Sequence, residues 1–260
     1  MGGSRRSSFV GFMLEQAFFP LSYWRRHMTV FSKFTMYVAG ALVTGGAMAA
    51  PIAVVNHSFE TDDVSGLANQ LNADIVPTGW GEYDDGRNNA TAGNARGLVY
   101  HGPGPSVIAD TGLGQNDGSQ SFFTAQRDIL QVLGATLQAN TTYTLTVAIG
   151  DRDLDGAGGD PGDPIVNLGY GATGGANIVL SIDSTGQPAQ VDGGWVDWSG
   201  TFSTGASPAG EGQALRIELT NGTNVGWFDN VRLDASPVPE PGSLALLGLG
   251  GLALLRRRHA

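Results

Sequence analysis

The chain has 260 residues, with 14 Lys and Arg against 24 Asp and Glu, and it has no cysteine. Eight of the 14 basic residues lie in 1–49 and 237–260, so residues 50–236 hold six basic and 22 acidic residues, a formal charge of −16. Such a charge repels nucleic acid and anionic lipid, which excludes both as partners of this part of the chain. The absence of cysteine excludes disulfides, thiol chemistry and Cys-ligated zinc.

The first 49 residues predict a leader. After Met28, the predicted true start, Lys33 precedes an apolar stretch from Met36 to Val43, and Ala47-Met48-Ala49 follows as an A-x-A site. This order is typical of a secretory signal peptide that is cut before the next residue, Ala50. Ala47 and Ala49 are therefore the predicted signal-cleavage residues.

Residues 50–236 carry the pattern of a β protein. Between Thr142 and Ile149, apolar residues alternate with threonines, the period of two of a half-buried strand. Gly-rich turns separate further short runs, and no 3.6-residue period is sustained, which predicts an all-β sandwich. The expected strands are Pro51–Glu60, Gly97–Tyr100, Ser106–Ala109, Ser121–Gln126, Thr142–Ile149, Ile178–Ile182, Trp195–Phe202, Leu215–Leu219 and Trp227–Leu233. Asp128 to Ala139 fits either a loop or one helical turn.

Three separate stretches carry a family resemblance: Asn56-His57-Ser58-Phe59-Glu60 followed by Gly79-Trp80, then Ala139 to Val147, and finally Trp227-Phe228-Asp229-Asn230-Val231-Arg232-Leu233. Together they resemble the galactose-binding-like jelly roll of many carbohydrate-binding modules. The resemblance implies a structural calcium where the first and last strands meet, with Glu60 and Asp229 as ligands. The other interpretation is that Asp229 and Asn230 only satisfy the backbone of a turn.

A second calcium hypothesis concerns Asp151-Arg152-Asp153-Leu154-Asp155-Gly156. Asp151, Asp153 and Asp155 at positions 1, 3 and 5, with glycine at position 6, match the first half of an EF-hand loop. Position 12 is Gly162 where the motif has glutamate, and Asp160 or Asp163 is the available substitute. A solvated acidic loop is the alternative.

Aromatic side chains that line a polar loop are the expected sugar platform, because the C–H face of a pyranose packs on an aromatic ring. Trp80 and Tyr83 are chosen on this ground. Trp195 and Trp198 lie three apart on a strand and point to opposite faces, so at most one of them belongs to the core. Carbohydrate binding itself is an implication of the family resemblance.

Motifs of catalysis are absent from residues 50–236, which predicts a protein that is not an enzyme. Only His57 and His101 are histidines there, and neither G-x-S-x-G nor H-E-x-x-H occurs. Carboxylate pairs such as Glu82 and Asp84 are expected by chance among 22 acidic residues.

The C-terminus carries three signals in order: Pro239-Glu240-Pro241, an apolar run from Leu244 to Leu255, and Arg256-Arg257-Arg258. This order resembles the PEP-CTERM sorting tail of Gram-negative bacteria, which implies cutting near Pro-Glu-Pro by a membrane-embedded exosortase. The apolar run is shorter than the roughly 20 residues that span a bilayer, and the arginines favour a domain outside the cytoplasm. Ser236 to Pro239 is expected to be a stiff linker that keeps the cut site clear of the domain.

The sequence thus predicts a leader at 1–49, a jelly-roll β-sandwich at 50–236 and a sorting tail at 237–260, briefly anchored in the inner membrane. The predicted function is non-enzymatic binding of extracellular polysaccharide, with calcium support, at the cell surface or in the extracellular matrix. A structural or adhesive matrix protein without a sugar pocket is the alternative. An ice-binding protein and a glycoside hydrolase are the remaining hypotheses.

Overall fold

The computed structural model describes residues 48–67, 71–83, 96–101, 113–125, 127–151, 162–222 and 225–238, with the backbone alone at 71–73. These residues belong to one compact unit. Their regular elements are all strands, and none of them forms a helix able to cross a membrane.

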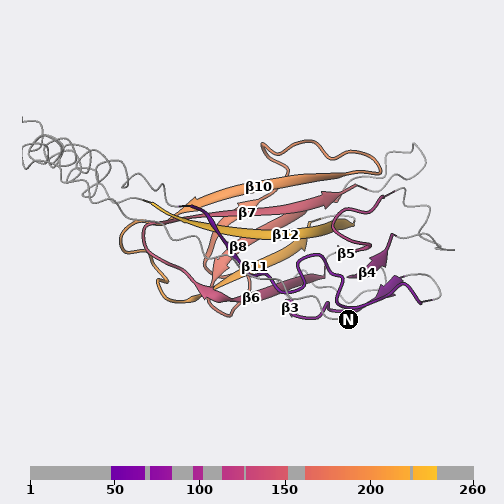
Figure 1. The fold of residues 1–260 in the computed structure, drawn as a ribbon, viewed down its shortest axis with the longest axis horizontal. Coiled ribbons are helices and arrows are strands. Elements are labelled where there is room, and N and C mark those ends of the chain that lie inside the picture. Colours follow the sequence, from indigo (N-terminus) through magenta and orange to yellow (C-terminus); the bar gives the residue numbers. More distant parts are fainter. Residues whose placement is uncertain are drawn as a thin grey trace, which may run out of the picture. The chain divides into compact units, whose positions relative to one another are not determined.

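Two antiparallel sheets form the fold (Figure 1). The larger sheet has the order β10-β7-β12-β5-β4-β2, with β1 paired to β12, and the smaller has the order β3-β6-β11-β8-β9. In the larger sheet the strands are β1 (Ala50–Ile52), β2 (Leu71–Ala73), β4 (Arg96–Tyr100), β5 (Gln120–Thr124), β7 (Thr141–Gly150), β10 (Trp195–Ser203) and β12 (Gly226–Pro237). In the smaller they are β3 (Gly81–Tyr83), β6 (Asp128–Thr136), β8 (Pro164–Tyr170), β9 (Ile178–Ile182) and β11 (Ala214–Asn221). The predicted all-β jelly-roll sandwich is confirmed.

Alternation along the strands builds the core between the sheets. Tyr143, Leu145, Val147 and Ile149 of β7 are all buried, as their spacing predicts, and they pack with apolar residues of β11 and β12. The threonines between them lie on the outer face. Trp198 is also a core residue, while Trp195 lies outside this core, in agreement with their predicted opposite directions.

Several local predictions were wrong. The opening strand ends at Ile52, and Asn56 and Phe59 have φ angles of 50° and 59° that turn the chain before Glu60. The undecided stretch after Asp128 is strand β6, because Ile129 and Leu133 face the core at strand spacing. Ser106–Ala109 lies outside the described residues.

The predicted stiff linker between the domain and the tail is also wrong for Ser236 to Val238. Strand β12 continues to Pro237, which pairs with Thr141 of β7. The next residue, Val238, donates its N–H to the carbonyl of Asn140 at 2.7 Å. Ser236 and Pro237 are therefore part of the sheet, because β7 offers backbone partners up to its first residue.

A buried ion pair ties a loop to the outer face of the smaller sheet. Arg216 and Glu218 of β11 are 0% and 1% exposed, and the guanidinium Nε lies 2.7 Å from Glu218 Oε1. Arg216 also donates to the carbonyls of Tyr170, Gly171 and Ala176, and the N–H of Gly175 donates to Glu218. Loop 171–177 therefore covers both charged side chains.

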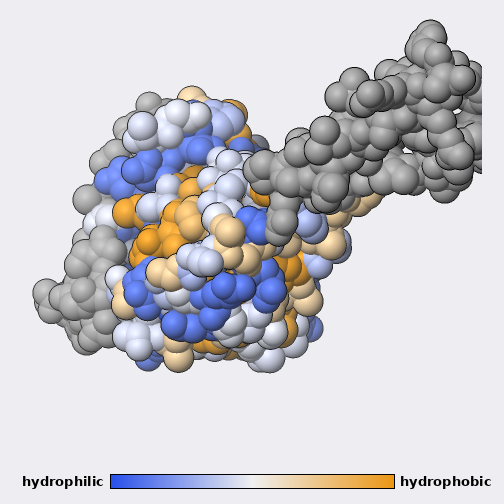
Figure 2. Space-filling view, turned by 90° about the vertical axis from the view of Figure 1, so that its left-hand side faces the viewer, coloured by the Kyte–Doolittle hydropathy of each residue, from blue (hydrophilic) through white to orange (hydrophobic). Residues whose placement is uncertain are grey.

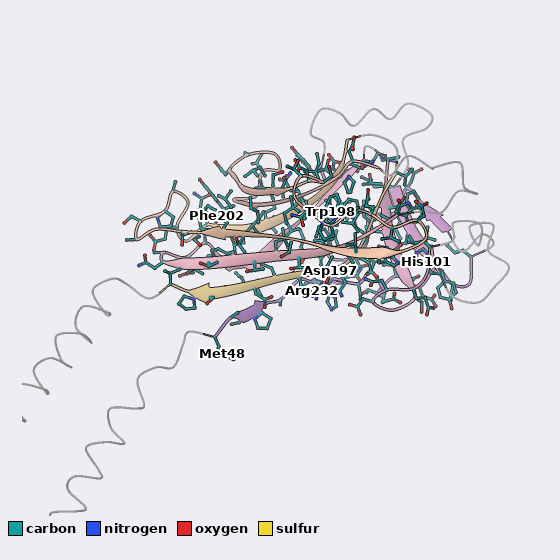
Figure 3. The ribbon with its side chains drawn as sticks, turned by 90° about the horizontal axis from the view of Figure 1, so that it is seen from above. Met48, His101, Asp197, Trp198, Phe202 and Arg232 are labelled. Carbon is teal, nitrogen blue, oxygen red and sulfur yellow. The ribbon has the colours of Figure 1, made fainter. Side chains whose placement is uncertain are left out.

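We predict that Glu218→Ala lowers the free energy of unfolding by about 3–5 kcal/mol, because it leaves the guanidinium buried without its counter-ion. Urea unfolding measures the change. The matched control is Asp197→Ala, which breaks the exposed pair with Arg232 on the other sheet (Figure 3). The control should change stability by less than about 1 kcal/mol, and equal losses in the two variants would contradict the prediction.

Candidate functional site

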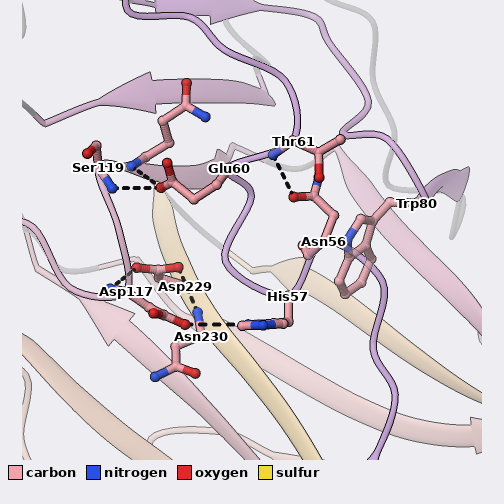
Figure 4. A network of polar contacts seen from close by, with 10 residues as sticks. Asn56, His57, Glu60, Thr61, Trp80, Asp117, Ser119, Asp229 and Asn230 are labelled. Atoms are coloured by element: carbon pink, nitrogen blue, oxygen red, sulfur yellow. Dashed lines mark hydrogen bonds and ion pairs between the residues drawn. The ribbon is translucent and has the colours of Figure 1, made fainter. Parts of the chain in front are cut away.

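Two carboxylates from distant parts of the chain hold segment 113–120 against the larger sheet (Figure 4). Asp229 Oδ2 accepts a hydrogen bond from the N–H of Asp117 at 2.9 Å. Glu60 Oε1 accepts from the N–H groups of Ser119 and Gln120 at 2.7 and 2.5 Å. Gly118 lies between these contacts with φ of +97°, and a Cβ there would stand 2.5 Å from Glu60 Oε1. Glycine is therefore required at this position.

The turn at residues 56–61 gives Glu60 its direction. The N–H of Phe59 donates to the carbonyl of Asn56, and the N–H of Thr61 donates to the Asn56 side chain. The carbonyl of His57 accepts from the N–H of Val231 in β12, which fixes the turn to the last strand. The first and last motifs of the domain therefore meet, as the sequence resemblance implied.

Asp229 is a buried carboxyl group at an irregularity of β12. The register of β12 against β7 shifts between Asp229 and Arg232, and Asn230 has a φ of 47°. Burial of Asp229, which is 1% exposed, raises its pKa to about 7, and the charge of Asp117 acts in the same direction. Hydrogen bonds from the N–H groups of Asp117 and Asn230 oppose that rise. A large fraction of this group therefore keeps its proton at neutral pH.

The predicted calcium ligands Glu60 and Asp229 approach the same segment, but their contacts are with main-chain N–H groups. Among the described residues, no three Asp, Glu or His side chains gather as a metal site. The arrangement is that of a turn with satisfied backbone groups, so no chemical step here is assigned to calcium. Calcium binding stays a prediction.

A second apolar cluster lies on the outer face of the larger sheet, beside Asp229. This outer aromatic cluster consists of Val99, Leu113, Phe123, Trp195, Val225 and Trp227. Phe123 and Trp227 pair across β5 and β12, with ring centroids 5.4 Å apart, while their neighbours Phe122 and Phe228 point into the core. The Nε1–H of Trp195 donates to the carbonyl of Gly114 at 2.7 Å, which ties segment 113–120 to this cluster.

His101 connects the aromatic rings to the polar side of the site. Its ring stands edge-on to Trp195 and Trp227, with centroids 6.2 Å from each. Its Nε2 lies 2.7 Å from the hydroxyl of Ser121. Burial lowers the pKa of His101 to about 4, so the imidazole is neutral at pH 7. By alternation, Ser121 and Asp229 share the outer face with Phe123 and Trp227.

This arrangement combines a carboxyl group that keeps its proton near neutral pH, a neutral imidazole and the faces of several aromatic rings. Such a set donates a proton and stabilises a positive charge on a bound molecule, since aromatic faces attract cations. It contains no strong nucleophile.

The structure places the remaining predicted site residues elsewhere. Trp80 is 7% exposed and packs on Phe59 in the core, which does not fit an open sugar platform. Tyr83 is half-buried against the backbone of Gly174 and Gly175. Asp151 is buried and forms a β-bridge with Asp192. Asp153, Asp155, Ala47, Pro239, Glu240, Pro241 and Arg256, Arg257 and Arg258 lie outside the described residues, and Ala49 is exposed.

Sequence reasoning did not predict that His101, Ser121, Phe123 and Trp227 lie together on one face of the larger sheet. One signal was present: Phe122-Phe123 and Trp227-Phe228 put two large apolar residues next to each other in a strand. Because neighbours in a strand point to opposite faces, such a pair indicates apolar layers on both sides of the sheet.

Comparison with known proteins identifies the family. The HpiC1-like family, described as HpiC1 cyclase, matches residues 50–234. The chain belongs to the HpiC1-like cyclase family. The PEP-CTERM protein-sorting motif matches residues 237–258, which confirms the sorting tail of an exported protein directed to the cell envelope and implies exosortase processing. No curated protein matches the chain significantly.

Solved cyclases of Fischerella sp. TAU share the fold. The Stig cyclase Fisc, in complex with (3Z)-3-(1-methyl-2-pyrrolidinylidene)-3H-indole, is 26% identical with a TM-score of 0.59. A Fischerella cyclase in complex with 4-(1H-indol-3-yl)butan-2-one is 26% identical with a TM-score of 0.60. Each match covers 74% of this chain and 100% of the cyclase. A xylan-binding domain of Paenibacillus barcinonensis is 13% identical with a TM-score of 0.42, too low a likeness to support an argument.

These matches overturn the predicted non-enzymatic, carbohydrate-binding function. The family is one of cyclases, and the ligands of the two Fischerella complexes are indole compounds. The prediction was wrong because it took the absence of known catalytic motifs as a sign that the protein has no activity. Side chains that the fold brings together from distant parts of the chain leave no motif in the sequence.

We predict that Asp229 makes stability depend on pH. Its pKa is higher in the folded chain than in the unfolded one, so its contribution is complete below about pH 4 and is lost as pH rises through about 7. Relative to Asp229→Asn, the native chain should lose stability on the order of 4 kcal/mol across this range. Guanidinium unfolding from pH 4 to 8 measures it, with the exposed Glu211→Gln as control. Parallel pH profiles for the native chain and Asp229→Asn would disprove the assignment.

Proposed function

We propose that this protein is an exported cyclase that closes a ring on an aromatic substrate, with Asp229 as the proton donor. The observation that carries the proposal is the position of Asp229, a buried carboxyl group on the same sheet face as the outer aromatic cluster. Membership of a cyclase family supports it, as do the Fischerella cyclases that are in complex with indole compounds.

The reaction is an isomerisation in this scheme. Asp229 gives its proton to the substrate, which becomes a cation, and a carbon–carbon double bond of the same substrate attacks that cation to form the ring. The product then returns a proton to the Asp229 carboxylate, so nothing is oxidised or reduced. Trp227 and Phe123 present π faces to the cationic intermediate, an attraction of about 0.5–2 kcal/mol for each ring.

The neutral state of His101 matters in this scheme. An imidazolium beside the cluster would repel a cationic intermediate, whereas burial keeps this ring uncharged and hydrogen-bonded to Ser121. The substrate class follows from the same surroundings: a flat apolar ring system of the indole type, as in the ligands of the two Fischerella complexes.

Access to Asp229 requires movement of segment 113–119, because the side chain is 1% exposed beneath it. The contacts that must open are the hydrogen bonds of Asp117 to Asp229 and of Trp195 to Gly114. Release of the first bond removes an N–H that stabilises the charged carboxylate, but exposure to water would remove the burial that raises the pKa of Asp229. The bound substrate must therefore exclude water from this carboxyl group. We also infer that the enzyme acts at the cell surface after the tail has been processed.

We predict that 4-(1H-indol-3-yl)butan-2-one binds the chain at the outer aromatic cluster. In ¹H–¹⁵N spectra of the chain without its leader, the indole N–H signals of Trp195 and Trp227 should shift. Those of Trp80 and Trp198, which are core residues, serve as internal controls. Shifts confined to the core tryptophans would place the site elsewhere, and no shift at all would contradict binding of this compound.

We predict that Asp229→Asn lowers turnover at least 100-fold, the usual worth of a positioned general acid. The assay follows, by mass-resolved chromatography, the ring closure of an indole whose side chain carries a carbon–carbon double bond. The rate of the native enzyme should fall as pH rises through about 7, because the acid loses its proton there. Asp197→Asn, an exposed carboxylate on the same face, is the control. Unchanged turnover in Asp229→Asn would refute the role of this group.

A further inference from the structure

The chain enters and leaves the sandwich at the same end. Strand β1 runs antiparallel to the end of β12, with Ala50 opposite Ala235. Strand β12 stays paired with β7 up to Pro237, and Val238 is still hydrogen-bonded to Asn140. The match to the sorting motif begins at residue 237. The motif therefore starts inside the folded sheet, with no spacer between them.

The tether between the domain and the tail is short. Five residues, 239–243, separate Val238 from the apolar run that begins at Leu244. Fully extended, five residues span at most about 18 Å. While the apolar run is held in a membrane, this end of the sandwich must lie close to the lipid.

The loops at this end are suited to that position by their charge. Segments 137–140 and 203–213 are joined to it through hydrogen bonds of Asn140 to Gly205 and of Leu137 to Gln213. Their only charged residue is Glu211, whereas the whole of 50–236 has a formal charge of −16. The net charge of the domain repels an anionic lipid surface, but these loops carry little of that charge. The short tether, and no attraction of the domain for lipid, would hold this end at the membrane.

The surface of this end also exposes an apolar group. Val238 is 41% exposed at the end of the last strand. Figure 2 looks at the domain from the left-hand side of Figure 1 and shows apolar residues gathered between hydrophilic ones.

We propose that this tail-end face, formed by 137–140, 203–213 and 235–238, lies against the outer surface of the inner membrane until the tail is cut. Trp227 stands ten residues before Pro237 in β12, a separation of about 33 Å at strand spacing. The outer aromatic cluster consequently lies near the opposite end of β12 from the tether. This orientation depends on the sorting motif and on the fold, and it is independent of the cyclase proposal.

The experiment uses the full chain without its leader, tail intact, in vesicles of phosphatidylethanolamine and phosphatidylglycerol with nitroxide-labelled headgroups. Because the chain has no cysteine, single fluorescent labels are placed through Ala206→Cys on the tail-end face and Val191→Cys near the far end of β10. We expect quenching at position 206 to exceed that at position 191 several-fold. Insertion of 12 Gly and Ser residues after Val238 should reduce the difference to less than half.

Two outcomes overturn the proposal. Equal quenching at positions 206 and 191 in the chain of native length would show that the domain has no fixed end toward the lipid. A difference that the insertion leaves unchanged would show that the short tether does not set the orientation. Circular dichroism of both labelled chains verifies that each variant is folded, so that a loss of folding is not mistaken for a change of orientation.

Discussion

The hydrogen bonds of two carboxylates to segment 117–120 are the constraint on which the rest of the site depends. Glu60 comes from the turn after β1 and Asp229 from the last strand, and both reach the same run of N–H groups. The contacts join the beginning, middle and end of the domain. They also bury Asp229 beneath the segment that it binds. The same packing therefore holds the segment in place and raises the pKa of Asp229.

The larger sheet is apolar on both faces at one end and polar on its outer face at the other. Near β5 and the start of β12, Phe123 and Trp227 add an aromatic layer outside the core. Further along β7, threonines such as Thr142 and Thr146 pair with serines of β10 on that outer face. This outer apolar layer is separate from the core between the sheets. It provides the low-polarity surroundings that raise the pKa of Asp229 and lower the pKa of His101.

Both ends of strand β12 have a role in this account. Its first residues carry Trp227 and Asp229, and its last residues pair with β1 and lead directly into the sorting motif. One strand thus separates the candidate site from the tail-end face that we propose to lie against the membrane. In these two proposals, cleavage of the tail takes place beyond the last residues of β12 and ring closure takes place at its first residues. The two sites are therefore well separated.

The sequence by itself determined the sorting tail, the all-β fold and most of the long strands, because a sorting motif and period-two alternation are local patterns. The signal peptide stays a prediction. Residues such as Tyr143 and Leu145 face the core by their spacing alone. Only the tertiary structure decided that Trp80 is buried, that the pKa of Asp229 is raised and that the ring of His101 stands edge-on to two tryptophans. The raised pKa of Asp229 and the packing around the outer aromatic cluster depend on residues more than 80 positions apart in the chain, such as Trp195 and Gly114. The desolvation that sets them exists only after the two ends of the domain have met.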